Sequence, residues 1–191
     1  LVLGRLVERK GVGDVVTALA QLPGVELTIA GGPSWDALAA DPEVCRLRDL
    51  ARRTGIADRV RFLGRVSHAD VPRLIRASDV VVAVPWYEPF GIVPVEAMAN
   101  GRPVVGTAVG GLLDTVVPGE TGELVPPRRP YLLARVLQRL LADPARCRRY
   151  GEAGYRRAAA TYRWEQVAAA TEAVYESVLS RSQQPTTEAI R

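Results

Sequence analysis

The sequence contains few of the residues that carry thiol, metal or histidine chemistry in proteins. Its two cysteines, Cys45 and Cys147, lie far apart and match no spacing of metal ligands, so we expect free thiols in a reducing compartment. Its one histidine, His68, precedes a helical pattern and is expected to open that helix rather than to act as a catalyst. No apolar run approaches the ~20 residues of a membrane helix, and no signal-peptide pattern is present. These absences indicate a soluble globular protein without a thiolate metal site.

Lysine is nearly absent: of the 25 lysine and arginine residues, 24 are arginine and one is lysine, Lys10. Residues 128–163 hold ten arginines against two acidic residues, a balance of +8, so the rest of the chain sums to −4 within the net charge of +4. A basic face of this kind can be solvated, meet a membrane surface or meet an acidic partner. These three interpretations stay open, and no nucleic-acid partner is expected.

The 191 residues, of which 48% are hydrophobic and 6% aromatic, suffice for one sizeable domain that buries roughly 70% of its unfolded surface. The chain opens on Leu1 inside an apparent strand and without methionine. We therefore expect it to be an excerpt of a longer protein.

Strands alternate with helices along the chain, which predicts a parallel sheet covered on both faces. Strands are expected at 1–4, 25–30, 59–63, 80–84, 104–106 and 122–125, and longer helices at 14–22, 35–54 with a break at 41–42, 69–77, 131–141, 144–162 and 164–179. Six strands favour a Rossmann-like, doubly wound α/β sheet in the order 3-2-1-4-5-6, with ligand in the crevice beyond the carboxyl ends of the strands. The loops after the first and fourth strands flank that crevice.

The richest of these loops leads from the fourth strand into a short helix. Gly91 lets the backbone approach a ligand closely, Pro94 suits the first turn of the helix, and Asn100-Gly101 forms its C-cap. The start of such a helix attracts anions. Glu88 and Glu96 flank it, and carboxylates accept hydrogen bonds from hydroxyls. The stretch therefore suits a ligand that carries hydroxyls attached to a phosphate, such as a ribose or a sugar.

Glu88 and Glu96, with Pro-Phe-Gly between them and Pro-Val-Val-Gly-Thr-Ala-Val-Gly-Gly after them, resemble the E-x7-E motif of retaining glycosyltransferases of the GT-B fold. The resemblance covers roughly residues 1–180 and implies the C-terminal half of such an enzyme. By this resemblance the chain binds a nucleoside-diphosphate sugar and belongs to an enzyme that transfers the sugar to a hydroxyl acceptor. No cofactor is implied. No Asp-x-Asp sequence occurs, so we expect no metal site of the other large transferase fold.

The resemblance also assigns roles to single residues. Residues 4–11 are similar to the GR-L-x-x-x-K-G loop of the family, in which Arg5 and Lys10 hold the diphosphate. Glu96 accepts the ribose hydroxyls, and Glu88 faces the donor sugar and stabilises positive charge at its anomeric carbon. Simpler interpretations remain open: solvated basic residues, a carboxylate that orders its own loop, and an acid in the first helical turn that the helix dipole favours.

Further contacts are implied for the backbone. The N–H groups that would serve the sugar and phosphate belong to Gly91, Ile92 and Val93, and Val66 matches the position whose backbone reads the base. Trp86 stands where a small serine is common and is expected to narrow the sugar pocket. Asp114 replaces a glutamate of the family pattern and is left out of the site.

Three segments are expected: a donor-binding domain at 1–163, a crossover helix at 164–180 and a disordered tail at 181–191. A helical stripe that includes Val167 and Val174 would contact an N-terminal domain absent from this sequence. Without that domain we expect no transfer activity. The competing hypothesis is a non-catalytic nucleotide-binding or regulatory module of the same ancestry. A cytoplasmic location is expected, and contact with the inner face of the membrane remains an alternative.

Overall fold

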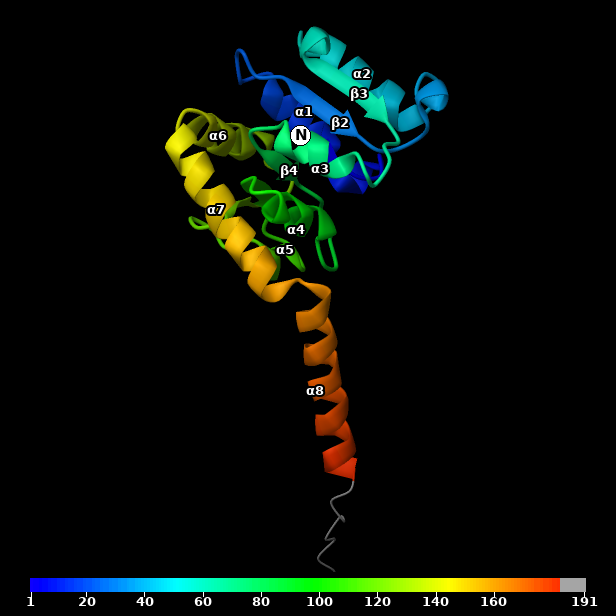
Figure 1. Ribbon diagram of the computed structural model, residues 1–191. Helices are drawn as coiled ribbons and strands as arrows, with labels where there is room; N and C mark the ends of the chain where they lie inside the picture. Colours follow the sequence, from blue (N-terminus) through cyan, green and yellow to red (C-terminus); the bar gives the residue numbers. More distant parts are fainter. Residues whose placement is uncertain (183–191) are drawn as a thin grey trace, which may run out of the picture.

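The computed structural model of the protein describes residues 1–182, and Figure 1 shows an α/β body from which one long helix projects. The strands of this described part are β1 (Val2–Leu3), β2 (Leu27–Ala30), β3 (Val60–Gly64), β4 (Val81–Ala83), β5 (Val104–Thr107) and β6 (Gly122–Val125). Its helices are α1 (Val12–Leu19), α2 (Pro42–Arg53), α3 (Val71–Arg76), α4 (Ile92–Ala99), α5 (Leu112–Thr115), α6 (Pro130–Leu141), α7 (Pro144–Thr161) and α8 (Trp164–Ser182), with 3-10 turns at Glu8–Lys10, Trp35–Ala37 and Ala57–Arg59. The alternation of strands and helices is as predicted.

The strands pair in parallel and form two three-stranded sheets, β1-β2-β3 and β4-β5-β6. Leu1 joins the two sheets. Its carbonyl accepts from the N–H of Val82 at 2.8 Å, and its amino group donates to the carbonyl of Val80 at 2.9 Å. Across this junction the strand order is 3-2-1-4-5-6, the doubly wound order predicted from the sequence.

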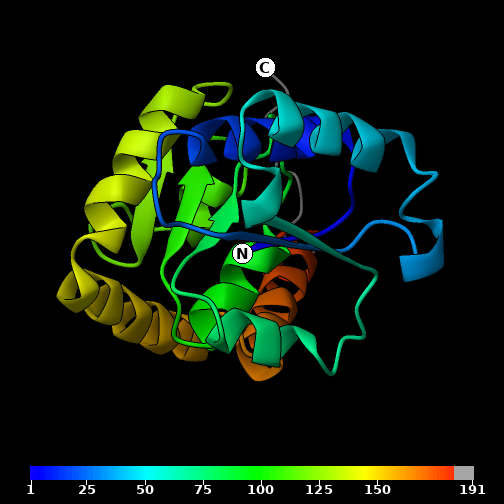
Figure 2. The ribbon, with the colours of Figure 1, turned by 90° about the horizontal axis from the view of Figure 1, so that it is seen from above.

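The sheets have one apolar cluster on each face, because successive side chains of a strand point to opposite faces. Val82 and Val105 belong to one cluster, whereas their neighbours Val81 and Val104 belong to the other. The first cluster includes side chains from α1, α2 and α6, and the second includes side chains from α3, α4 and α7. Figure 2 shows α1 and α2 on one side of the strands and α3 and α4 on the other. Each fully buried aliphatic side chain stabilises the fold by about 1.5–3 kcal/mol.

Helix boundaries follow from their caps. The carboxylate of Asp41 accepts from the N–H of Val44 at 2.9 Å and caps α2, with Pro42 in the first turn. This cap explains the break predicted at 41–42. The expected helix before the break is reduced to the short 3-10 turn Trp35–Ala37. Gly101, with a φ of 68°, follows the C-terminus of α4 in the left-handed conformation expected for it.

Helix α8 extends away from the body beyond α7 (Figure 1). Its apolar side chains face solvent: Trp164 is 85% exposed, and Val174 and Val178 are each 58% exposed. The predicted stripe is therefore uncovered in this chain. The helix continues to Ser182, and the rest of the tail predicted to be disordered lies outside the described residues. The division of the chain at residue 163 stays a prediction.

Candidate functional site

The loops after β1 and β4 meet at the carboxyl ends of these neighbouring strands. Gly11, at the end of the first loop, has a φ of 70°, and a Cβ at this position would overlap the carbonyl oxygen of Val84. The approach of the two chains thus requires glycine. The backbone N–H of Trp86 donates to the carbonyl of Arg9 at 2.8 Å and ties the loops together one residue before Lys10.

Lys10 and Glu88 form an ion pair between the two loops. Their side chains are 26% and 18% exposed, so the pair is partly shielded from water. Two residues that sequence analysis assigned to one site are therefore in contact, although 78 positions separate them. Arg5, on the same loop as Lys10, is exposed and forms no hydrogen bond or ion pair within residues 1–182. The structure brings Lys10 and Glu88 together and leaves Arg5 at the surface.

The loop that carries Glu88 packs against the loop after β5. The N–H of Gly111 donates to the carbonyl of Glu88 at 3.0 Å. A Cβ at Gly110 would overlap the backbone of Glu88, and one at Gly111 would overlap the backbone of Phe90. The Phe90 ring also packs edge-on against Tyr162 near the end of α7, with centroids 6.1 Å apart. The two glycines thus allow a close backbone contact that fixes the position of Glu88.

Helix α4 begins beside this loop. Gly91 is its N-cap and Ile92 its first residue, so the N–H groups of Gly91, Ile92 and Val93 lie at the end where a helix leaves its donors unpaired. Pro94 is the third helical residue. Sequence analysis placed Glu96 in the first turn, and this was wrong: the helix starts two residues before Pro94, and its first turn holds no acidic residue. A glutamate beyond the first turn gains little from the helix dipole.

Glu96 is half-buried, and its surroundings disfavour the charged form of its carboxyl group in the unliganded chain. Burial raises the pKa of its carboxyl group, and the charge of the nearby His68 opposes part of this shift. No donor within the described residues reaches this carboxylate at hydrogen-bond distance. The side chain is therefore a partly desolvated acceptor without a donor. His68, which sequence analysis set aside as a helix-start residue, lies exposed near Glu96 and before α3.

Val66 and His68 belong to the loop that follows β3. Its start is fixed by the N–H of Arg65, which donates to the carbonyl of Pro33 at 2.8 Å. Val66 is half-buried and His68 is exposed. The loop thus lies at the carboxyl edge of the sheet, on the same side as Glu96, and no contact of Val66 with the other candidate residues is shown.

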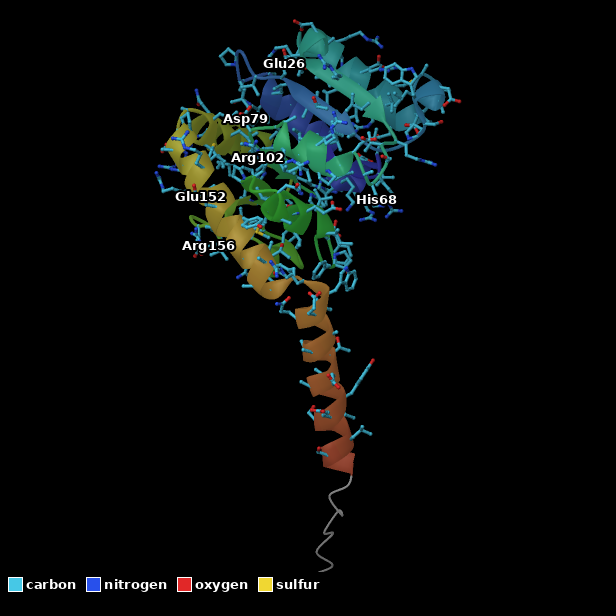
Figure 3. All side chains as sticks on the ribbon, viewed as in Figure 1. Glu26, His68, Asp79, Arg102, Glu152 and Arg156 are labelled. Carbon is cyan, nitrogen blue, oxygen red and sulfur yellow. The ribbon has the colours of Figure 1, made fainter. Side chains whose placement is uncertain are left out.

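A large cavity of the described residues lies elsewhere. It has a volume of about 1530 Å³ and is lined at the amino ends of the strands by Leu1, Leu27 and Val80, among others. Charged residues at its rim include Glu26, Asp79, Arg102, Glu152 and Arg156, which Figure 3 labels on the left of the molecule, whereas His68 lies on the right. The cavity contains none of the predicted site residues. The candidate site is at the opposite end of the strands.

Comparison with known proteins identifies the family. The model of the family described as glycosyl transferases group 1 matches residues 1–157. The chain belongs to this family. It is 37% identical over 190 residues to a glycogen synthase of Mycobacterium tuberculosis, and the match covers 97% of this chain and 44% of that protein.

Two solved structures share the fold. The structure of sucrose-phosphate synthase from Thermosynechococcus elongatus superimposes with a TM-score of 0.83 at 40% identity, covering 94% of this chain and 45% of that one. Anabaena Alr3699/HepE, in complex with UDP, gives a TM-score of 0.80 at 30% identity over 94% of this chain and 48% of the other. The chain thus spans less than half the length of these relatives and has the fold of the C-terminal half of a GT-B glycosyltransferase, as predicted.

Two further features concern the described part of this group 1 chain. No helix there is long and apolar enough to cross a membrane. The described part also contains no group of three or more histidine, cysteine, aspartate or glutamate side chains that could hold a metal ion.

Proposed function

We propose that this chain is the donor-binding domain of a glycosyltransferase that transfers a sugar from a nucleoside-diphosphate sugar to a hydroxyl acceptor. The observation that carries the proposal is the Lys10–Glu88 pair between the loops after β1 and β4, beside the start of α4. A cation, a helix start and two carboxylates at one edge of a doubly wound sheet suit a ligand with a diphosphate and hydroxyls. The complexes of Anabaena Alr3699/HepE with UDP and with UDP-glucose support this donor class.

Each candidate residue has a role in this proposal. Lys10 carries three donors, so it can keep one on Glu88 and offer others to the diphosphate. Arg5, exposed on the same loop, adds a second cation, and the N–H groups of residues 91–93 serve phosphate and sugar. Glu96 accepts the ribose hydroxyls, which supply the donors that its carboxylate lacks in the unliganded chain. Val66 contacts the base through its backbone.

The proposed transfer retains the configuration of the anomeric carbon and forms no covalent sugar–enzyme intermediate. Glu88 and Glu96 belong to the elements that hold the nucleotide, so both are expected on the side of the leaving group. A double displacement would need a carboxylate on the opposite face of the sugar. Instead the leaving phosphate oxygen, stabilised by Lys10 and Arg5, accepts the proton of the incoming hydroxyl as charge develops on it. An inverted product, or a sugar trapped on Glu88 by a fluorinated donor, would overturn this mechanism.

The donor site is proposed to work without a metal ion, because Lys10, Arg5 and the start of α4 supply positive charge. Calorimetric titration of the chain with UDP, GDP and ADP, in the presence of EDTA, tests both the ligand class and the metal. Binding of one nucleotide that Lys10→Ala weakens supports the proposal. Absence of binding by all three and by their sugar derivatives, or binding that requires Mg²⁺, contradicts it.

Transfer is proposed to need a second domain that supplies the acceptor site and that covers the apolar stripe of α8. Turnover is therefore measured in a protein that includes such a domain, and this measurement also separates an enzyme from a non-catalytic nucleotide-binding module. We further propose a cytoplasmic location. Contact with a membrane would be detected as co-sedimentation with anionic vesicles. The exposed basic residues of α6 and α7 to neutralise in that test are Arg135, Arg139, Arg148, Arg149 and Arg156.

A further inference from the structure

Trp86 lies at the point where three loops of the candidate site meet. It precedes Glu88 by two residues, and its backbone N–H is bonded to Arg9, the neighbour of Lys10. Trp86 is half-buried, whereas Trp35 is 71% and Trp164 85% exposed. Its side chain is thus held in the protein, next to both members of the Lys10–Glu88 pair in sequence.

The indole ring of Trp86 contacts two other segments, the start of α1 and the loop between β6 and α6. Its Nε1–H donates a long hydrogen bond, 3.4 Å, to Oδ2 of Asp14 in the first turn of α1. The guanidinium carbon of Arg128 lies 3.8 Å from the centroid of the ring, a close cation–π contact. Arg128 belongs to the loop between β6 and α6. One ring therefore connects the loop after β4 with the first turn of α1 and with the loop between β6 and α6.

Arg128 holds this position at a conformational cost. Its φ of 57° is the one positive value found for a residue other than glycine within residues 1–182. A side chain with a Cβ is strained in this region, and such strain persists only where surrounding contacts compensate for it. The contact that compensates is the cation–π contact of the guanidinium with the Trp86 ring. The strained residue thus sits where it can fix the loop that carries Glu88.

We propose that Arg128, Trp86 and Asp14 form a clamp that positions Lys10 and Glu88 for the nucleotide-sugar donor. The clamp residues act through the loops and do not contact the donor. By ordering the two loops against the start of α1 before the ligand arrives, the clamp lowers the ordering cost that binding would otherwise carry. The inference rests on the proposed function, because it assigns the clamp to the same donor site.

The alternative role for Arg128 is direct contact with the diphosphate. A double-mutant cycle separates the two roles, since a residue that acts only through Trp86 has no effect once the ring is gone. The variants are Arg128→Ala, Trp86→Leu and the double variant. Arg129→Ala is the matched control, because Arg129 is the adjacent exposed arginine and its loss changes the net charge equally. The probe is the nucleoside diphosphate, among UDP, GDP and ADP, that the wild-type chain binds most tightly.

We expect Arg128→Ala to weaken nucleotide binding by about 3- to 10-fold, the size of one cation–π contact, and Arg129→Ala to leave it unchanged. In the Trp86→Leu background, Arg128→Ala has no further effect. Arg128→Gly separates the effect of backbone strain from that of the lost contact. Glycine tolerates the positive φ, so the melting temperature of this variant should be no lower than that of Arg128→Ala. Its affinity for the nucleotide should nevertheless be as low as that of Arg128→Ala. A purely structural role of Arg128 would instead make affinity follow melting temperature.

A second measurement needs no nucleotide. With Trp35 and Trp164 replaced by phenylalanine, Trp86 is the one remaining tryptophan, and Arg128→Ala should increase the quenching of its fluorescence by acrylamide. Unchanged quenching overturns the clamp, as does an effect of Arg128→Ala that persists in the Trp86→Leu background or equals that of Arg129→Ala. If the wild-type chain binds no nucleotide, the proposed function fails and the role of the clamp fails with it. If it binds and the variants bind equally, only the clamp fails.

Discussion

Replacing Glu96 with glutamine should stabilise the unliganded chain and weaken its binding of nucleotide. The carboxylate is half-buried without a hydrogen-bond donor among the described residues, and burial raises its pKa. A raised folded-state pKa of an acid means that ionisation costs more in the folded than in the unfolded chain. This carboxyl group therefore favours folding below its unfolded pKa, and that contribution is lost as the pH rises through the folded pKa.

The expected gain in stability is small, because a half-exposed carboxylate keeps part of its hydration. At pH 7 we expect Glu96→Gln to raise the melting temperature by about 1–3 °C, on a scale where about 1 kcal/mol corresponds to about 2–4 °C for a chain of this length. The rise should disappear near pH 4, where the wild-type group is largely protonated too. Glu120→Gln is the control, since Glu120 is exposed in the turn before β6, at the other end of the strands.

The loss of affinity should be larger. A hydrogen bond to a charged group contributes about 1.5–3 kcal/mol, which corresponds to about 10- to 100-fold, and glutamine keeps one acceptor, so we expect the lower end. In the wild type, affinity should fall as the pH drops through the raised pKa of Glu96. Calorimetry and thermal melts of the same samples check both signs. A lower melting temperature at pH 7, or an unchanged affinity, would refute the assignment of Glu96 to the ribose.

Two other predictions concern the charged residues of the loops at the carboxyl ends of the strands. Lys10→Ala should weaken nucleotide binding by about 10-fold or more and, in the two-domain enzyme, slow transfer more than it weakens donor binding; equal effects would argue against a role in the transition state. Glu88→Ala should leave nucleotide affinity nearly unchanged and lower kcat in steady-state assays, and a comparable loss of affinity would contradict its assignment to the sugar.

The meeting of the two site loops could be predicted because it follows from topology. In a doubly wound sheet of order 3-2-1-4-5-6, the first and fourth strands are neighbours, and their carboxyl ends share one edge. The prediction needed only the alternation of strands and helices, which places the loops at 4–13 and 85–93 after the first and fourth strands. The contact between Lys10 and Glu88 shows that the two loops meet as this topology requires.

The start of α4 was placed too late for a specific reason. The first four N–H groups of a helix have no partner within it, so proline is tolerated throughout the first turn. Pro94 therefore indicated a first turn without indicating which of its positions it occupies. It is the third residue, and the shift moves Glu96 beyond the first turn, where burial raises its pKa and the helix dipole does not compensate.

Contacts between side chains of distant loops could not be predicted. The proximity of His68 to Glu96 depends on how the loop after β3 turns, and no local pattern specifies it. Arg128 was equally hidden, because nothing in an arginine indicates a left-handed backbone. Trp86 was expected to narrow the sugar pocket, and in the structure its ring contacts Asp14 and Arg128.

The position of the large cavity shows why concavity alone is a poor guide to this site. The cavity of about 1530 Å³ is at the amino ends of the strands, whereas the Lys10–Glu88 pair and the start of α4 lie at the carboxyl ends on an open surface. The matched relatives are more than twice as long as the part this chain covers. A ligand site shared between two domains is open when one wall is viewed alone. The chemistry of its residues, and not the depth of its surface, therefore identifies this edge of the sheet as the donor site to test.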